Sequence, residues 1–279
     1  MHTFTIRQLR RYAGHLRENE RSPATLEKYI RALRQLYRWL PDAKHVDKER
    51  IIHYKAYLTE RYAPASVNAE LAAINGFFRF LGWEECRVKP LRIQRRVFSS
   101  TEKELNREEY RRLVAAARQS GNPRLSLLLQ LMASTGIRVS EIRYVTREAV
   151  ERGSVTIRLK GKIRVILLPG KLCRQLKKYI RAEKIASGAV FRTRDGRPMS
   201  RKVIWAQMKR LCGEAAVPPE KVFPHNLRRL FARTFYHAQK DVVKLADLLG
   251  HSSVETTRIY LLSSGAEHRK ALEQLRLIC

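Results

Sequence analysis

Four short stretches in the second half of the chain carry side chains of the types that perform chemistry. Arg138 and Glu141 lie in the segment TGIRVSE at residues 135–141, and a short basic segment further on contains Lys160. The third stretch is HNLR at residues 225–228, and the fourth is LGH at residues 249–251, followed nine residues later by Tyr260. Side chains of these types bind anionic groups, transfer protons and act as nucleophiles.

Each of these stretches alone also fits a purely structural role. An Arg after a Gly is usually a surface residue, and an Arg and a Glu three residues apart often form a helical ion pair. A Lys in a hairpin turn is normally exposed to solvent, and most Tyr side chains lie in cores or interfaces. The informative observation is the order and spacing of all four stretches in one strongly basic chain.

The charge of the chain indicates a polyanionic partner. Lys and Arg number 57 against 26 Asp and Glu, so the formal net charge is +31 over 279 residues. Nucleic acid is the first candidate, and an anionic membrane surface is the second. A membrane-surface protein needs a basic amphipathic segment with an apolar side toward lipid, whereas here the basic residues are spread along the whole chain. Composition therefore predicts binding to DNA or RNA, and ribosomal proteins share this charge.

The sequence carries no recognisable metal or nucleotide motif. The four cysteines are scattered without a Cys-x-x-Cys pair, and the eight histidines form no His-Glu-x-x-His. Carboxylates are sparse and unclustered, which weighs against a two-metal nuclease. A Gly-rich phosphate loop is also missing. We expect no metal and no cofactor.

The chain is also expected to be cytoplasmic. Its longest apolar stretch, residues 125–133, is too short to cross a membrane and is interrupted by Gln130. The N-terminus runs directly into charged helical sequence, so no signal peptide is expected.

Periodicity and capping residues predict four helices in the first part of the chain. We expect them at about residues 6–17, 22–40, 48–60 and 66–81. In the second helix, Arg31, Arg34 and Arg38 share a face that is separate from the apolar stripe. These three arginines form either an ordinary solvated face or a contact surface for DNA phosphates, and the net charge favours the phosphate contact.

A stretch rich in Arg, Ser and Pro, residues 87–103, is predicted to be a linker before a second domain. That domain opens with a helix at Asn106, capped by Glu109 three residues later. A buried helix over residues 125–133 follows. Alternating apolar residues then predict a β-hairpin with a basic tip, its second strand carrying Val165 and Leu167. Further helices are expected at about residues 171–184, 201–212, 225–236, 241–249, 253–262 and 266–277.

In its motifs and their order, the chain resembles the tyrosine recombinases, a family that includes phage integrases and the Xer-type recombinases. The catalytic boxes of the family resemble residues 135–141, 225–228 and 249–260, and its N-terminal core-binding domain resembles residues 22–40 and 65–82. The resemblance implies a mainly α fold with a small β-hairpin. It comprises a four-helix SAM-like core-binding domain at residues 1–86, a linker at 87–103 and an α+β catalytic domain at 104–279.

The resemblance also implies roles for individual residues. Arg138 and Arg228 would hold the non-bridging oxygens of the scissile phosphate, where a planar, permanently charged guanidinium suits two oxygens. Tyr260 would attack phosphorus, forming a 3′-phosphotyrosyl bond and releasing a 5′-hydroxyl. His225 would accept the phenol proton, and Lys160 would protonate the departing 5′-oxygen.

Two further residues would support this machinery. His251 would hydrogen-bond the phosphate or orient the arginines, and Glu141 would fix the geometry of Arg138 or a neighbour. The hairpin tip is one residue shorter than the commonest family form, which leaves Lys162 as an alternative to Lys160. The terminal segment at residues 266–278 is amphipathic and docks either on a neighbouring subunit or on its own domain.

The implied function is site-specific recombination of double-stranded DNA through a Holliday junction. The expected assembly is a homotetramer on two DNA sites, from a protein that is a monomer or dimer in isolation and nucleoid-associated when bound to DNA. A mobile-element role, as in integration, belongs to the same expectation. Two alternatives stay open: a type IB topoisomerase-like enzyme, and a non-catalytic DNA-binding protein that uses residues 241–262 as a helix-turn-helix.

Overall fold

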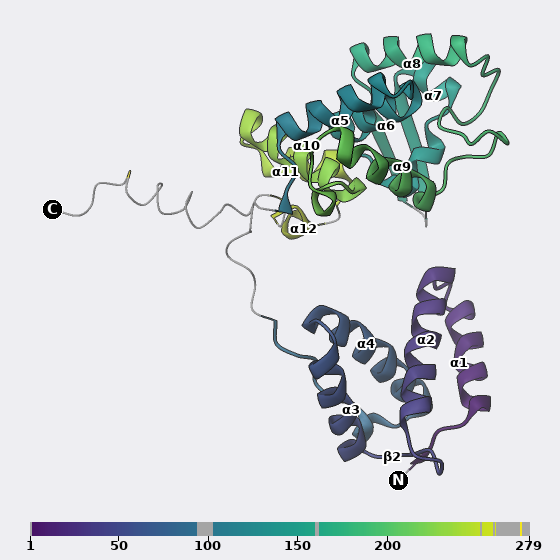
Figure 1. Cartoon of the computed structure of the whole chain (residues 1–279). Coiled ribbons are helices and arrows are strands. Elements are labelled where there is room, and N and C mark those ends of the chain that lie inside the picture. The colour runs from purple at the N-terminus through teal and green to yellow at the C-terminus, as the bar shows by residue number, and fades with distance from the viewer. Residues whose placement is uncertain are drawn as a thin grey trace. The chain divides into compact units, whose positions relative to one another are not determined.

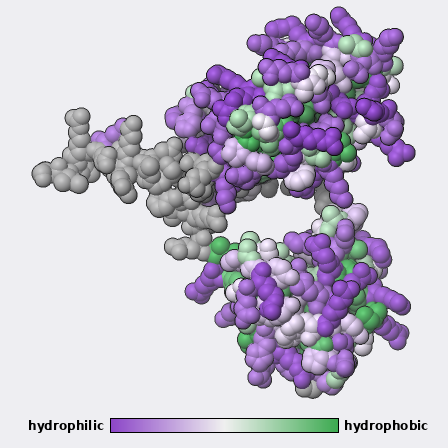
Figure 2. Space-filling view, viewed as in Figure 1, coloured by the Kyte–Doolittle hydropathy of each residue, from purple (hydrophilic) through white to green (hydrophobic). Residues whose placement is uncertain are grey.

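The structure is a computed structural model that describes residues 2–93, 103–159, 162–251, 253–258, Tyr260 and Gln274. By its internal contacts the chain divides into two units, Met1–Arg95 and Arg96–Cys279. Both are mainly helical, and Figure 1 labels their α-helices. Hydrophilic side chains dominate the face of each unit seen in Figure 2, as the high proportion of charged residues requires.

The first unit contains the four helices that periodicity predicts. They are α1 (Ile6–Glu18), α2 (Pro23–Trp39), α3 (Lys48–Arg61) and α4 (Pro64–Leu81), followed by the 3₁₀ helix η1 (Glu84–Cys86). Two short strands, β1 (His2–Thr3) and β2 (His45–Val46), pair antiparallel. The Ser22 hydroxyl caps α2, and Gly82 ends α4 with a φ of 74° in the left-handed region.

The first unit packs around an aromatic core and extends past residue 86, where the sequence prediction ends it. Phe4, Phe77 and Phe78 are almost fully buried in this core. Asn75 on α4 exchanges two hydrogen bonds with the backbone of residue 88, of 2.8 and 3.1 Å, and Asn68 does the same with residue 91. The first residues of the predicted linker therefore pack on the first unit.

The second unit combines helices with a β-hairpin. Its helices are α5 (Arg107–Gln119), α6 (Pro123–Thr135), η3 (Val139–Tyr144), α7 (Arg147–Arg152), α8 (Gly170–Ala182), α9 (Arg201–Glu214), η4 (Pro219–Lys221), α10 (Pro224–Gln239), α11 (Val242–Leu249) and α12 (Val254–Arg258). Strands β3 (Ser154–Leu159) and β4 (Lys162–Leu167) form the antiparallel hairpin. As the sequence predicts, Asn106 and Glu109 form the capping box of α5.

The second strand of the hairpin buries the opposite face from the one that its apolar alternation suggests. Val165 and Leu167 are 53% and 67% exposed, whereas Ile166 is 3% exposed. The register explains the difference, because directly opposed residues share one face of a sheet. Buried Ile157 pairs with Arg164, so Arg164 and Ile166 lie on the inner face.

Near the functional residues, one predicted helix is shorter than expected, and two predicted features lie outside the described residues. The helix expected over residues 253–262 is shorter, because α12 ends at Arg258. Tyr260 lies in a turn, and its backbone N–H donates to the Thr257 carbonyl at 3.0 Å. Lys160 and all of residues 266–278 except Gln274 lie outside the described residues, and only the backbone of Lys162 is described. Among the described helices, none combines the length and apolarity needed to cross a bilayer.

Candidate active site

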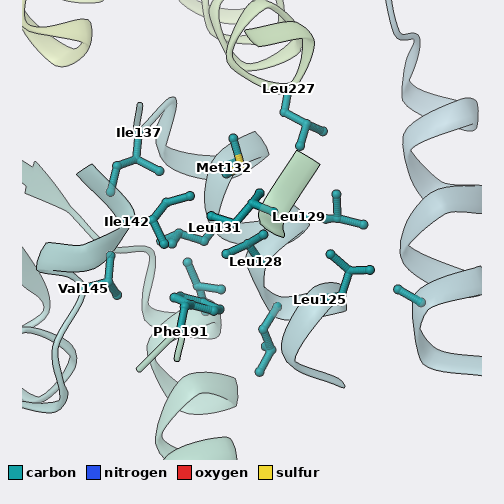
Figure 3. Close-up of a cluster of buried hydrophobic side chains, with 14 of the residues drawn as sticks. Leu125, Leu128, Leu129, Leu131, Met132, Ile137, Ile142, Val145, Phe191 and Leu227 are labelled. Carbon is teal, nitrogen blue, oxygen red and sulfur yellow. The ribbon is translucent and has the colours of Figure 1, made fainter. Parts of the chain in front are cut away.

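The core of the second unit holds the backbone on which the candidate residues stand. Figure 3 shows buried side chains of α6 packed against Ile137, Ile142 and Leu227. These three residues directly precede Arg138, follow Glu141 and precede Arg228 in the sequence. Burying each neighbour in one close-packed core restricts the positions that the polar side chains can occupy.

The first turn of α10 presents His225 and Arg228 one helical turn apart. Pro224 occupies the first helical position, which suits its fixed φ. Asn226, fully buried between them, donates to the carbonyls of Lys103 at 2.7 Å and Lys221 at 2.9 Å. This anchor fixes the rotation of the helix, and hence the direction of the other two side chains.

Arg228 is buried, with 3% of the residue exposed, and makes hydrogen bonds to two segments that are distant in the sequence. Its guanidinium donates to the Gly136 carbonyl, to the Leu249 carbonyl at 2.8 Å and to Nε2 of His251 at 2.9 Å. Burial, followed by the nearby positive charge of Arg138, lowers the pKa of Arg228 to about 10. The guanidinium is therefore still charged at neutral pH.

Two glycines allow these segments to approach each other closely. Gly136 and Gly250 both adopt φ of 61°, a conformation that side chains disfavour. A Cβ at Gly136 would lie 2.6 Å from Phe231, and one at Gly250 would lie 2.6 Å from Nε of Arg164. The two glycines therefore allow the left-handed backbone at the helix ends and leave room for the neighbouring side chains of Phe231 and Arg164.

Glu141 joins two arginines from different elements. Its buried carboxylate accepts from Arg138 Nη1 at 2.9 Å and from Arg164 Nη1 at 2.8 and 3.0 Å. Arg138 also donates to the Gly250 carbonyl at 3.3 Å, and Arg164 to the Leu248 carbonyl at 2.9 Å. The Arg138 side chain is 40% exposed and that of Arg164 only 11%, so Arg138 is the one that a ligand can reach.

The phenol of Tyr260 lies close to two imidazoles. Its ring centroid is 5.8 Å from that of His251, with the planes nearly parallel at 16°, and 5.5 Å from that of His225. Tyr260 is only 5% exposed and packs against Leu245 and Leu249. A potential nucleophile is thus held beside two imidazole side chains.

Both imidazoles are neutral at pH 7. Burial, reinforced by Arg228 and Arg138, lowers the pKa of His251 to about 4. Burial and the positive charges of Arg229 and Arg228 also lower the pKa of His225. A neutral imidazole has one nitrogen lone pair, which a proton acceptor requires. The lone pair of His251 already accepts from Arg228, so His225 is the candidate acceptor.

The structure brings six of the predicted site residues into one cluster: Arg138, Glu141, His225, Arg228, His251 and Tyr260. The remaining predicted residues are in other places. Lys160 lies outside the described residues, whereas Arg31, Arg34 and Arg38 are exposed on α2 in the first unit, where they line a groove of about 600 Å³.

Arg164 and Thr257 belong to the cluster but were missed in the sequence. The signal for Arg164 is its position in β4, two residues before buried Ile166 and so on the inner face. The signal for Thr257 is its place three residues before Tyr260, and it is fully buried with its hydroxyl 2.8 Å from Nδ1 of His251.

Within the described part of the chain, one group of side chains is close enough to share a metal ion. It consists of His2, Glu85 and Cys86, whose ligand atoms lie within 4.8 Å of one another in the first unit. His2 Nε2 hydrogen-bonds the Glu85 carboxylate. The arginines around Tyr260 instead concentrate positive charge beside a phenol, which suits an anionic substrate.

Comparisons with known proteins identify the family of the chain. Residues 103–267 match the model of the phage integrase family, and residues 9–85 match that of the phage integrase N-terminal SAM-like domain. The chain is 30% identical to tyrosine recombinase XerA of Thermococcus kodakarensis over 268 residues, covering 92% of this chain and 91% of that protein. Tyrosine recombinase XerD of Xanthomonas campestris pv. campestris is 31% identical over 268 residues, covering 85% and 81%.

Solved structures share the fold. A lambda integrase dimer bound to a COC′ core site matches with a TM-score of 0.74 at 20% identity, over 92% of this chain and 94% of that one. The XerH site-specific recombinase in a post-cleavage complex with a palindromic difH substrate matches with a TM-score of 0.72 at 19% identity, over 96% and 84%.

Proposed function

The chain belongs to the phage integrase family of tyrosine recombinases, and we propose that it recombines DNA at specific sites through a covalent bond between Tyr260 and a DNA 3′-phosphate. The observation that carries this proposal is the convergence of guanidinium and imidazole groups on one buried phenol. Arg228, for example, hydrogen-bonds a carbonyl 92 residues before it and one 21 residues after it.

In the proposed reaction, Arg138 and Arg228 bind the two non-bridging oxygens of the scissile phosphate. Negative charge grows on these oxygens as the Tyr260 oxygen approaches phosphorus, so fixed cations stabilise the transition state more than the ground state. Glu141 is the positioning residue for Arg138, since its carboxylate accepts hydrogen bonds from both Arg138 and Arg164.

Two proton transfers accompany the exchange of phosphodiester bonds. His225 accepts the phenol proton as the bond from Tyr260 oxygen to phosphorus forms. The bond from phosphorus to the 5′-oxygen breaks, and Lys160 protonates that oxygen. Because one phosphodiester replaces another, attack by a 5′-hydroxyl reverses the reaction without nucleotide hydrolysis.

Double-stranded DNA is the proposed partner, and strand exchange is the proposed outcome. Solved relatives include XerH bound to its difH substrate and a lambda integrase tetramer bound to a Holliday junction. By analogy we infer a tetramer of this chain on two sites. Arg31, Arg34 and Arg38 would contact phosphates from the groove on α2, where all three are exposed.

A covalent-adduct assay tests the central assignment. Duplexes that the protein selects from a randomised pool are nicked near the site, so that the cleaved fragment diffuses away, and the products are run on a denaturing gel. We expect wild-type protein to leave a protein–DNA adduct. Tyr260→Phe should bind the duplex with similar affinity and leave none, because the attacking oxygen is missing.

Tyr236→Phe is the matched control, since Tyr236 packs in the same small apolar cluster as Tyr260. It should form the adduct at the wild-type rate. Adduct formation by Tyr260→Phe would remove the assignment of the nucleophile. Binding without an adduct in wild type would favour the non-catalytic alternative, and relaxation of supercoiled plasmid without a selected site would favour the topoisomerase alternative.

A further inference from the structure

The His251 imidazole has a hydrogen-bond partner at each nitrogen. Nε2 lies 2.9 Å from Nη2 of Arg228, and Nδ1 lies 2.8 Å from the hydroxyl oxygen of Thr257. Thr257 is fully buried, and its carbonyl also accepts the backbone N–H of Tyr260 at 3.0 Å. One residue therefore contacts both the imidazole and the turn that carries the phenol.

The chemistry of Arg228 determines which nitrogen of His251 carries the proton. A guanidinium has five N–H donors and no acceptor, so Nε2 of His251 must offer a lone pair. The imidazole is neutral beside Arg228, Arg138 and Arg164, so its single proton lies on Nδ1. In this state Nδ1–H donates to the Thr257 oxygen.

A bound phosphodiester requires the opposite arrangement. Its oxygens carry no proton and only accept hydrogen bonds, so His251 can bind one of them through Nε2 only if Nε2 carries the proton. The proton leaves Nδ1 for solvent and another is taken up at Nε2, which keeps the ring neutral. Nδ1 then needs a donor, and a hydroxyl can donate as well as accept.

We propose that Thr257 is a positioning residue that holds His251 in both neutral tautomers, accepting from Nδ1 in the free enzyme and donating to Nδ1 when a DNA phosphate is bound. This inference rests on the proposed function, because it takes the scissile phosphodiester as the ligand. Nη2 of Arg228 donates one hydrogen to the Leu249 carbonyl and the other to Nε2 of His251. The change of tautomer ends the hydrogen bond to His251, so that second hydrogen becomes available to the phosphate.

Imidazole ¹⁵N chemical shifts of full-length, histidine-labelled Tyr260→Phe protein test the tautomers directly. The spectrum is recorded without DNA and with a selected duplex, at saturation verified by fluorescence anisotropy. For His251 we expect the Nδ1–H tautomer without DNA and the Nε2–H tautomer with DNA. An imidazolium ion in the complex, or an unchanged tautomer, would overturn the proposal.

Substitutions test the consequence for the reaction in the wild-type background. Thr257→Val removes the hydroxyl at nearly constant volume and should slow single-turnover adduct formation about tenfold, with DNA affinity unchanged. Thr257→Ser keeps the hydroxyl and should restore the rate. Thr256→Val is the matched control, since Thr256 is the exposed neighbour on the same helix, and it should have no effect.

A second background separates positioning from packing. In His251→Gln protein, adding Thr257→Val should cause little further loss, because Thr257 acts through the imidazole. Equal loss in both backgrounds, or failure of Thr257→Ser to restore the rate, would contradict the proposal. The ¹⁵N measurement still decides it if Thr257→Val does not fold. Absence of any adduct in wild type would instead count against the proposed function, since the tautomers are read without cleavage.

Discussion

Arg138 makes contacts that a lysine cannot reproduce. Its guanidinium reaches Glu141 with Nη1 and the Gly250 carbonyl with Nη2 while 40% of the side chain stays exposed. A lysine ammonium is a point charge that cannot span these partners and two phosphate oxygens in one plane.

Arg138→Lys should therefore lower single-turnover adduct formation by about 10²-fold or more, the cost typical of losing one transition-state donor. Arg143→Lys is the control, since Arg143 lies five residues away on η3 and contacts the neighbouring Tyr144 instead. An unchanged rate in Arg138→Lys would contradict the phosphate-binding role.

The low pKa of His251, about 4, predicts a pH dependence of stability. A histidine in the unfolded chain has a pKa of about 6.5, so between these two pKa values the unfolded state binds more protons. The free energy of unfolding should therefore fall as pH is lowered from about 6.5 to about 4, and this contribution should be constant above 6.5.

Urea denaturation at a series of pH values, for wild type and His251→Gln, measures this contribution. The fall should be shallower in the variant. His237→Gln, at an exposed position of α10, should leave the wild-type slope unchanged. Parallel curves for wild type and His251→Gln would show that His251 is not buried beside cations as described.

At the scale of elements, the hairpin and the end of α11 meet at Gly250. Arg164 extends from β4 past this glycine to the Leu248 carbonyl and to Glu141. A Cβ at position 250 would overlap the middle of the Arg164 side chain, whose guanidinium is held at its far end.

Gly250→Ala should therefore lower the free energy of unfolding more than a Gly→Ala change elsewhere that only strains a left-handed backbone. Gly153→Ala is the matched control, because Gly153 has φ of 78° but open space around its Cβ position. We expect the control to lose about 1 kcal/mol in urea denaturation and Gly250→Ala to lose clearly more, with slower adduct formation as well. Equal losses would contradict the contact with Arg164.

The elements also show where sequence patterns are sufficient. The capping box of Asn106 and Glu109, and the left-handed ends at Gly82 and Gly136, depend on residues a few positions apart, so they are predictable. The buried face of β4 depends instead on pairing with β3. Its apolar residues lie on both faces, so alternation alone does not identify the buried one.

At the scale of the whole molecule, a net charge of +31 predicts DNA binding that weakens steeply with salt. Changing Arg31, Arg34 and Arg38 together to Gln should reduce the slope of log affinity against log salt concentration by about 2 to 3, roughly one counterion per lost phosphate contact. Fluorescence anisotropy at several salt concentrations measures this slope.

A variant with the same loss of charge tests whether position matters. Arg7, Arg10 and Arg11 are exposed arginines of α1, and changing all three to Gln should alter the slope less. Equal effects of the two triple variants would indicate that bulk charge, and not the groove on α2, sets the salt dependence.

By itself the sequence determined the family, the four helices of the first unit, most helices of the second and six residues that meet at one site. It did so because motifs, caps and periodicity are local properties of the chain. Only the tertiary structure decided that Arg164 faces inward to share Glu141, that Gly136 and Leu249 receive the Arg228 guanidinium, and that Thr257 binds His251. The contacts of Arg164 and Arg228 depend on strand register and on packing between segments that lie 21 to 92 residues apart in the sequence, so helix or strand periodicity does not contain them. The contact of Thr257 with His251, six residues away, depends on how both side chains are packed.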